Sequence, residues 1–314
     1  MSEPPRLLVV VNERAGMREA IARELPHVPF RFLAEAAPAD AGNVEAALLG
    51  SMGRDAARWE PAAFPRLRFI QRAFTGVDDL PFDRLPPGVE VAGNVGAYAP
   101  FVAEHALALA LGGLRQLKVR ARATSWGKQK GATLYGAPVT LLGGGGITLE
   151  LLELLAPFHV EATVVRRSAA PVPGAARTVP PSGLHEALAP ALVVFVALAL
   201  VPDTINFISA PELSVMRPDA WLVNVGRGRH VDTPALVEAL QTGGIGGAAL
   251  DVTEPEPLPE GHPLWDLPNC LITPHTANTA EMSAPLLAER VQDNVSRLAH
   301  GLPLVGTVDT VAGY

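Results

Sequence analysis

The sequence predicts an α/β protein with two domains, each built on a parallel sheet that helices cover. The first observation is length, because 314 residues suffice for two domains of ordinary size. The second is composition, since 48% hydrophobic and 18% charged residues exclude a disordered chain. The third is pattern: short apolar, β-branched runs alternate with helical periods, which is typical of strands buried between two layers of helices.

The N-terminal part of the chain predicts the first domain. Its expected elements are a strand at 7–11, a helix near 18–25 and a strand at 67–73. A long apolar helix at 101–111 follows and carries Glu104 and His105 in its first turns. Because these two polar residues lie on an apolar helix, we expect them to brace the fold rather than to react.

A second series of apolar strands predicts the second domain. The strands are expected at 139–142, 162–165, 192–198, 221–225, 248–252 and 271–273. A last helix near 284–298 returns the chain toward the first domain. We therefore expect one domain of residues 1–97 plus 285–314 and a second of residues 98–284, with an interdomain cleft for a ligand.

Net charge and cysteine content limit the classes of binding partner and the cellular compartment that we expect for this protein. The net charge of −7 argues against nucleic acid or anionic lipid as the main partner. The longest apolar stretch, 191–201, is about half a bilayer span, so no membrane segment is expected. A single cysteine, Cys270, excludes an internal disulfide and suits a cytoplasmic protein. The histidines show no ligand spacing, so we expect no metal.

Residues 141–148, Leu-Leu-Gly-Gly-Gly-Gly-Ile-Thr, lie between a predicted strand and a predicted helix. Glycines at 143 and 145 allow a tight turn and let a pyrophosphate approach the helix N-terminus. Thr148 replaces the third glycine of this dinucleotide fingerprint, so a looser helix–strand fit is expected. A merely flexible turn is the alternative, but the flanking strand and helix weigh against it. Both domains are thus expected to be Rossmann-like, the second binding a dinucleotide.

The residues at the end of the second strand of this domain suggest which dinucleotide it binds. An acidic residue is expected there to hold the ribose hydroxyls of NAD. The sequence has Arg166, Arg167 and Ser168 instead, a set that suits the 2′-phosphate of NADP. The other interpretation is an exposed basic loop. We therefore predict NADP as the cofactor, with NAD possible.

Three later loops each hold one chemically suggestive residue after a predicted strand. These residues are Arg227, Glu256 and His275. Taken singly, each has a structural explanation as a surface ion-pair member, a solvated turn residue or a loop histidine. Because the carboxyl ends of parallel strands meet at one sheet edge, the three together predict a site beside the cofactor.

These residues belong to a longer set of motifs, by which the chain resembles the D-isomer-specific 2-hydroxyacid dehydrogenase family. That family includes phosphoglycerate dehydrogenases and glyoxylate/hydroxypyruvate reductases. The similarity covers nearly the whole chain and is strongest from Gly76 to His275. The matching segments are 76–78, 102–105, Trp126, the glycine loop, 202–204, 224–228, 231–232, 250–259 and 273–275.

The resemblance implies a role for each acid–base and substrate residue. Arg227 binds the substrate carboxylate and polarises the keto oxygen, and His275 is the general acid in reduction. Glu256 hydrogen-bonds His275 and fixes its tautomer. The backbone amides around Gly76 and Val77 complete the carboxylate site from the first domain, which the resemblance makes a flavodoxin-like, substrate-binding domain.

The resemblance also implies which residues of the dinucleotide-binding domain contact each part of the cofactor. The residues it implies are Gly146 and Ile147 at the pyrophosphate, Val225, Gly226 and Asp251 beside the nicotinamide, and Thr204 in the nucleotide cleft. Glu150, in the first turn of the fingerprint helix, stands where family members often carry a basic residue, so its carboxylate bears on cofactor affinity. A homodimer formed mainly through this domain is implied as well.

The reaction implied is hydride transfer between NAD(P)H, with NADP preferred, and the C2 carbonyl of a small 2-keto acid. A formate dehydrogenase fits less well, because that relative has a glutamine in the place of Glu256. The catalytic residues alone leave a phosphite dehydrogenase open. From a different class, a dinucleotide-binding sensor or corepressor-like protein with little turnover is the alternative.

Overall fold

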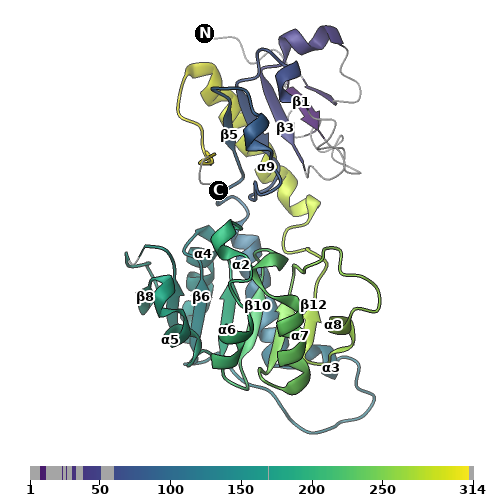
Figure 1. Cartoon of the computed structure of the whole chain (residues 1–314), viewed down its shortest axis with the longest axis vertical. Helices are drawn as coiled ribbons and strands as arrows, with labels where there is room; N and C mark the ends of the chain where they lie inside the picture. Colours follow the sequence, from purple (N-terminus) through teal and green to yellow (C-terminus); the bar gives the residue numbers. More distant parts are fainter. Residues whose placement is uncertain are drawn as a thin grey trace. The chain divides into compact units, whose positions relative to one another are not determined.

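The computed structural model describes residues 8–11, 23, 26, 30–32, 38–50, 60–168 and 170–310. The chain divides into two compact units, Met1–Tyr98 with Thr279–Tyr314, and Ala99–Asn278 (Figure 1). The second boundary falls ahead of the expected residue 285, because the last helix already begins at Ala280. The helix expected near 18–25 lies outside the described residues, apart from Arg23.

The first unit holds a five-stranded parallel sheet with the strand order β2-β1-β3-β4-β5. Its strands are β1 (Leu8–Val11), β2 (Phe30–Phe32), β3 (Ala46–Leu49), β4 (Phe69–Arg72) and β5 (Glu90–Ala92). An order of 2-1-3-4-5 is that of flavodoxin-like sheets.

The two faces of this sheet bury different sets of side chains. Helix α9 (Ala280–His300) packs Val291 and Val295 against Leu48 and Phe69 on one face. The opposite face has its own apolar cluster, composed of Val44, Ala47, Leu49, Phe64, Leu67, Ile70, Val77, Leu80 and Val91. The alternation of side chains along β3 and β4 explains this division.

The second unit holds a seven-stranded parallel sheet with the order β12-β11-β10-β9-β6-β7-β8. Its strands are β6 (Pro138–Leu142), β7 (Glu161–Val165), β8 (Arg177–Val179), β9 (Val193–Val196), β10 (Trp221–Asn224), β11 (Gly247–Leu250) and β12 (Cys270–Ile272). Counted from β6, this is the Rossmann order extended by one strand, and its topological switch point lies between β6 and β9.

Helices cover both faces of the larger sheet (Figure 1). They are α2 (Ala99–Leu114), α3 (Leu117–Arg120), α4 (Gly146–Leu155), α5 (Leu184–Leu188), α6 (Ala210–Val215), α7 (Thr233–Thr242) and α8 (Pro263–Asp266). Strand β9 points Val193 and Phe195 into the cluster with α2 and α4, and Val194 and Val196 into the cluster with α5, α6 and α7. The predicted fold class, two parallel-sheet α/β units, is confirmed.

Four short strands were not predicted, namely β2, β3, β5 and β8. Each has only three or four residues, and β3 is Ala-Ala-Leu-Leu while β5 is Glu-Val-Ala. The residues of β3 and β5 carry little β-propensity of their own, and β2 and β8 are only three residues long, so pairing with β1, β4 and β7 fixes the conformation of all four.

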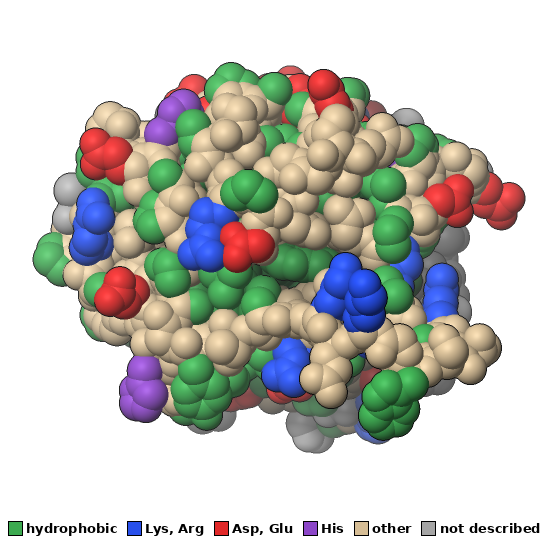
Figure 2. Space-filling model, turned by 90° about the horizontal axis from the view of Figure 1, so that it is seen from below, with side chains coloured by type: hydrophobic (Ala, Val, Ile, Leu, Met, Phe, Trp, Pro, Cys, Tyr) green, Lys and Arg blue, Asp and Glu red, His purple; other side chains and the backbone are tan. Residues whose placement is uncertain are grey.

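The described surface exposes apolar side chains among charged ones. Figure 2 shows hydrophobic, basic and acidic side chains interspersed on one face. The most exposed large hydrophobic side chain is that of Trp126, at 93%. It lies in the segment 115–130, which carries six basic residues and no acidic one. No helix in the described ranges is both long and apolar enough to cross a bilayer.

Candidate active site

The predicted functional loops of the larger unit follow strands that end in register. Across the sheet, Leu142 pairs with Val196, Val196 with Asn224, Asn224 with Leu250, and Leu250 with Ile272. The strands are parallel, so the residues after these positions share one edge. The glycine loop and the loops that carry Arg227, Asp251 and His275 therefore lie along the carboxyl edge of the sheet.

The glycine loop turns tightly after β6. Gly143 has φ +108°, and a Cβ there would lie 2.4 Å from the carbonyl oxygen of Ala197, so the fold itself demands glycine. Thr148, which replaces the third fingerprint glycine, is fully buried and donates its hydroxyl to the carbonyl oxygen of Gly143 at 3.0 Å. Instead of loosening the turn, Thr148 ties it to the first turn of α4.

Gly145 precedes α4, and the fold does not require a glycine at this position. It adopts an ordinary extended conformation (φ −87°, ψ −170°), and a Cβ on it would meet no atom within 4 Å. The space is open at the N-terminus of a ten-residue helix, next to Gly146 and the half-buried Ile147. Such a position, with backbone amides pointing outward, fits a pyrophosphate. The glycine cradle and the strand order thus fit a dinucleotide.

Arg166 lies over the glycine loop. A Cβ on Gly144 would come within 2.8 Å of Arg166 Cδ, which shows that the arginine side chain crosses the loop. Arg167 and Ser168 are exposed beside it, and the Ser168 hydroxyl accepts a hydrogen bond from the Ala170 amide at 3.2 Å. The structure therefore brings one of the two predicted arginines to the glycine loop.

The loop that carries Arg227 is fixed by buried polar side chains. Asn224 accepts from the Gly226 amide at 3.0 Å and donates to the Arg227 carbonyl at 2.9 Å. The Arg227 amide donates to Nδ1 of the buried His230 at 3.0 Å, and its guanidinium donates to the Gly226 carbonyl at 2.9 Å. Because its own backbone is held from both sides, Arg227 projects from a rigid turn.

Gly228 lets this turn contact the next loop directly. A Cβ on Gly228 would lie 2.0 Å from the carbonyl group of Thr253, which no larger residue could tolerate. The segment after Thr253 leads to Glu256, and the hydroxyl of Thr253 donates to the Pro255 carbonyl at 2.9 Å. The Arg227 turn and the Glu256 loop are thus packed against each other.

His275 and Glu256 form a close, half-exposed pair. Nδ1 of His275 lies 2.6 Å from Oε1 of Glu256, and the side chains are 50% and 41% exposed. Burial alone would raise the pKa of Glu256, but the hydrogen bond and charge of His275, the Thr253 amide and the Arg227 guanidinium hold it below its ordinary value. An ionised carboxylate only accepts, so Nδ1 of His275 donates and Nε2 is left for other chemistry.

Asp251 is buried between these loops, and both of its carboxylate oxygens are engaged. Oδ1 accepts from the Thr273 hydroxyl at 2.6 Å and the Thr276 amide at 2.9 Å, while Oδ2 accepts from the Ala277 amide at 3.1 Å. Nε2 of His105 lies 3.3 Å from Oδ1. This network was not predicted, because it joins α2 to the loop after β12.

The remaining predicted site residues are placed as follows. Val225 is buried at the end of β10. The Thr204 hydroxyl donates to the carbonyls of Ala199 and Val201 and accepts from the Val201 amide, so it holds together the loop after β9. Gly76 and Val77 belong to the first unit, where Val77 is buried in the sheet's apolar cluster.

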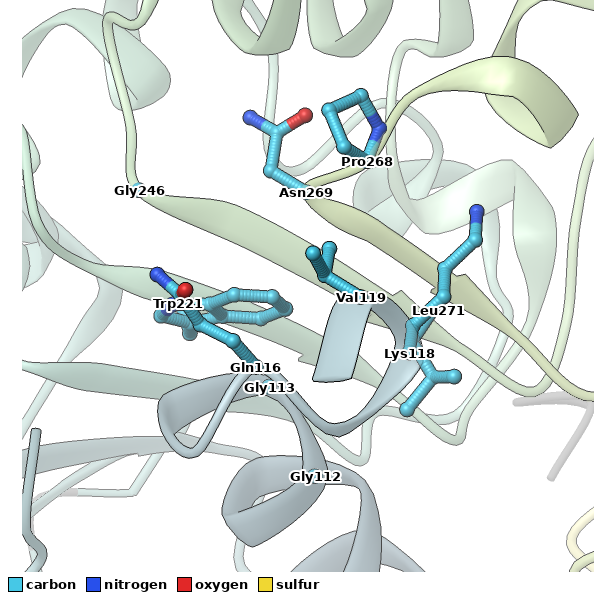
Figure 3. A pocket seen from close by; sticks show the side chains of 10 residues that line it. All are labelled: Gly112, Gly113, Gln116, Lys118, Val119, Trp221, Gly246, Pro268, Asn269 and Leu271. Atoms are coloured by element: carbon cyan, nitrogen blue, oxygen red, sulfur yellow. The ribbon is translucent and has the colours of Figure 1, made fainter. Parts of the chain in front are cut away.

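A pocket of about 180 Å³ lies away from these loops (Figure 3). Its lining includes Trp221, Gly246 and Asn269, which stand at or just before the first residues of β10, β11 and β12. It therefore opens at the amino edge of the sheet, opposite the site. Lys118 at its rim donates to the carbonyls of Trp265, Leu267 and Cys270, a structural role. Among the described residues, no group of three or more His, Cys, Asp or Glu could hold a metal.

Comparison with known proteins agrees with this geometry. Residues 105–277 match the family model "D-isomer specific 2-hydroxyacid dehydrogenase, NAD binding domain". A glyoxylate reductase from Aeropyrum pernix is 30% identical over 252 residues, which are 76% of this chain and 75% of that protein.

Two crystal structures show the same architecture over almost the full length. A D-isomer-specific 2-hydroxyacid dehydrogenase from Xanthobacter autotrophicus Py2, in complex with NADPH and MES, is 28% identical with a TM-score of 0.84, covering 99% of this chain and 100% of that one. The NADPH-dependent glyoxylate/hydroxypyruvate reductase of Sinorhizobium meliloti is 25% identical with a TM-score of 0.84, covering 98% and 99%. The chain therefore belongs to the D-isomer-specific 2-hydroxyacid dehydrogenase family.

Proposed function

We propose that this chain reduces a small 2-keto acid to the 2-hydroxy acid with NADPH, through Arg227, Glu256 and His275. The observation that carries the proposal is the 2.6 Å His275–Glu256 pair at the carboxyl edge of a Rossmann-ordered sheet, with Arg227 close enough to lower the pKa of Glu256. Bound NADPH supplies a hydride from C4 of its nicotinamide to C2 of the keto acid. One proton completes the reaction, and it must reach the former carbonyl oxygen.

His275 is the proton donor in this proposal. Glu256 accepts from Nδ1, which fixes the ring and balances the charge of the protonated imidazole. Nε2–H would then be directed to the carbonyl oxygen of the substrate, to which it would donate its proton. In the oxidation direction the same nitrogen removes the proton from the hydroxyl group.

Arg227 binds the carboxylate of the substrate. A guanidinium presents planar pairs of N–H donors that match the two oxygens of a carboxylate, and its charge draws electron density toward the adjacent keto oxygen, which leaves C2 more electrophilic. The backbone amides around Gly76 and Val77, in the first unit, are proposed to bind the substrate as well. The rigid turn described above keeps Arg227 oriented before the substrate arrives.

The cofactor is proposed to lie along the same edge. The residues that hold it are proposed to be Gly143, Gly145, Gly146 and Ile147 at the pyrophosphate, Thr204 in the nucleotide crevice, and Val225, Gly226 and Asp251 beside the nicotinamide. For Asp251 the proposal is limited to its neighbourhood, since its carboxylate oxygens are already engaged by the 273–277 segment.

The two fingerprint glycines are expected to respond differently to alanine. Gly143→Ala strains a left-handed position and meets Ala197, so it lowers the free energy of unfolding by about 2 kcal/mol. Gly145→Ala fills only open space, so it keeps stability within about 0.5 kcal/mol. The Cβ of the new alanine nevertheless occupies the proposed pyrophosphate position, so the Kd of the Gly145→Ala variant for NADPH rises. Urea unfolding and cofactor fluorescence titration measure both effects, and a Gly145→Ala variant with wild-type affinity contradicts the assigned cradle.

NADPH is proposed as the preferred cofactor because Arg166 crosses the glycine loop, with Arg167 and Ser168 next to it. Both structural relatives above are described with NADPH. Arg166→Ala is expected to raise the KM for NADPH about 10- to 100-fold, the worth of one charged contact, with little change for NADH. Arg217→Ala is the matched control, because that arginine pairs with Asp219 before β10. Equal losses with both cofactors would contradict a 2′-phosphate contact.

The proposed substrate is a short 2-keto acid, since the related enzymes are named glyoxylate and hydroxypyruvate reductases. Absorbance at 340 nm with NADPH or NADH and glyoxylate, hydroxypyruvate, pyruvate or phenylpyruvate tests it. Loss of NADPH in the presence of one of the shorter acids is the expected result. If no acid of the panel is reduced although cofactor binds, the proposed substrate class is wrong.

A homodimer formed through the larger unit is part of the proposal. That unit exposes six large apolar side chains on its first helices and connecting loop, namely Leu117, Val119, Trp126, Tyr135, Leu149 and Leu154. A second copy of the chain is proposed to cover these side chains. Light scattering of the purified protein measures the assembly directly.

A cytoplasmic location is proposed from the cysteine chemistry and the charge. The single thiol, Cys270, is buried, and burial raises its pKa to about 12, so it is held in the thiol form. The net charge of −7 argues against nucleic acid or anionic lipid as the main partner.

A further inference from the structure

Helix α2 supplies a histidine to the network beneath the acid–base pair. Nε2 of His105 lies 3.0 Å from the Thr273 hydroxyl and 3.3 Å from Oδ1 of Asp251. The His105 side chain is 23% exposed, whereas that of Asp251 is 2% exposed. The contact joins a helix at the start of the unit to the loop after its last edge strand.

The protonation of this network follows from its acceptors. Burial alone would raise the pKa of Asp251, but the hydrogen bonds of His105, Thr273 and the amides of Thr276 and Ala277 hold it below its ordinary value. The carboxylate is therefore ionised and only accepts. Since the Thr273 hydrogen goes to Asp251 at 2.6 Å, His105 must use Nε2–H as a donor toward both oxygens.

Asp251 in turn fixes the backbone that carries His275. Its side chain accepts the amides of Thr276 and Ala277, and its carbonyl accepts the His275 amide at 2.8 Å. His275 has φ +52°, a left-handed conformation that residues other than glycine rarely adopt. Such a conformation persists only where the surroundings impose it, and these three bonds do so.

We propose that His105 is a positioning residue for the acid–base pair: its Nε2–H orients Asp251 and Thr273, which hold the 273–277 segment and aim His275 at Glu256. The inference rests on the proposed function, in which His275 delivers the proton. His105 acts through Asp251 and Thr273, and it is assigned no contact with substrate or cofactor.

Three variants test the role. His105→Leu removes the donor and keeps a side chain of moderate bulk, His105→Gln restores an amide donor, and Thr273→Val breaks the same link from the other side without changing shape. Ala108→Gln, one turn further along α2 and exposed, is the matched control. The readouts are kcat, the KM for NADPH, the solvent deuterium isotope effect on kcat, and hydrogen exchange of the 273–277 segment.

His105→Leu and Thr273→Val are expected to lower kcat about 10- to 100-fold, the effect of a small misplacement of a reacting group. The KM for NADPH stays within about twofold, because the cofactor loop is untouched. The solvent isotope effect rises as proton delivery becomes slower, and exchange accelerates in 273–277. His105→Gln restores most of kcat and slow exchange, while Ala108→Gln matches the wild type.

The inference is overturned if His105→Leu keeps wild-type kcat and slow exchange in 273–277. It is also overturned if kcat falls with an unchanged isotope effect, exchange rises throughout α2 and His105→Gln gives no rescue, since that describes a purely structural loss. Failure of the proposed function is separable: the wild type would then reduce no keto acid, and exchange in the free variants would still report whether His105 holds the segment.

Discussion

His275→Gln is expected to lower the kcat for keto-acid reduction by about 10²- to 10⁴-fold, the range measured for loss of a general acid. Nε2 of His275 is the nitrogen that the 2.6 Å bond between Nδ1 and Glu256 leaves available to donate this proton. NADPH binding stays close to wild type, since the cofactor loop follows β6 rather than β12. Steady-state kinetics and a cofactor titration on the same sample measure both quantities.

The chain contains a matched control for this variant. His185 pairs with Glu212 at 3.0 Å and is about as exposed as His275, but it lies on α5. His185→Gln removes the same kind of histidine–glutamate pair and leaves kcat unchanged. Equal losses in the two variants, or a His275→Gln enzyme with more than about a tenth of wild-type kcat, would contradict the acid–base assignment.

Arg227→Met is expected to lower kcat/KM for the keto acid about 100- to 1,000-fold, chiefly by raising KM, because the substrate carboxylate loses a bidentate charged partner. Arg227→Lys recovers only part of this loss, since an ammonium cannot reproduce the planar fork. The loop itself stays folded, because the backbone of Arg227 is held by Asn224 and His230.

Arg229 provides the control for charge in this loop. It stands two positions further along the same turn and is exposed, so Arg229→Met removes a cation without touching the proposed site. A long-range electrostatic effect would lower kcat/KM in both variants, whereas a direct carboxylate contact lowers it only in Arg227→Met. An unchanged KM for the keto acid in Arg227→Met would rule out the contact.

The larger sheet was predictable from sequence because the apolar composition of its central strands identifies them. The β9 segment Val-Val-Phe-Val and the β6 segment around Val139 are apolar on both faces, which only a strand between two helix layers requires. By contrast, β3 and β5 have the composition of ordinary loops or helices and become strands through their neighbours. The predicted helix at 101–111 is longer in the structure, Ala99–Leu114, since apolar periodicity does not mark its ends.

The site was predictable as a set of loops but not as a network. Arg227, Glu256 and His275 follow strands in the sequence, so a parallel sheet must bring them to one edge. The link from His105 to Asp251 depends instead on how α2 packs across the sheet, which no local pattern encodes. The buried Thr148 bond to Gly143 is similar, because a threonine in place of a fingerprint glycine predicts a looser fit until its hydroxyl is placed.

The most direct test is to follow the label from NADPH that carries deuterium at both C4 positions of the nicotinamide, with hydroxypyruvate as the acceptor. We expect a 2-hydroxy acid of D configuration with deuterium at C2, formed in proportion to the NADPH consumed. Product without deuterium would contradict hydride transfer between these two carbons. Bound but unconsumed NADPH with every acid tried would contradict the proposed substrate class and favour the nucleotide-binding sensor.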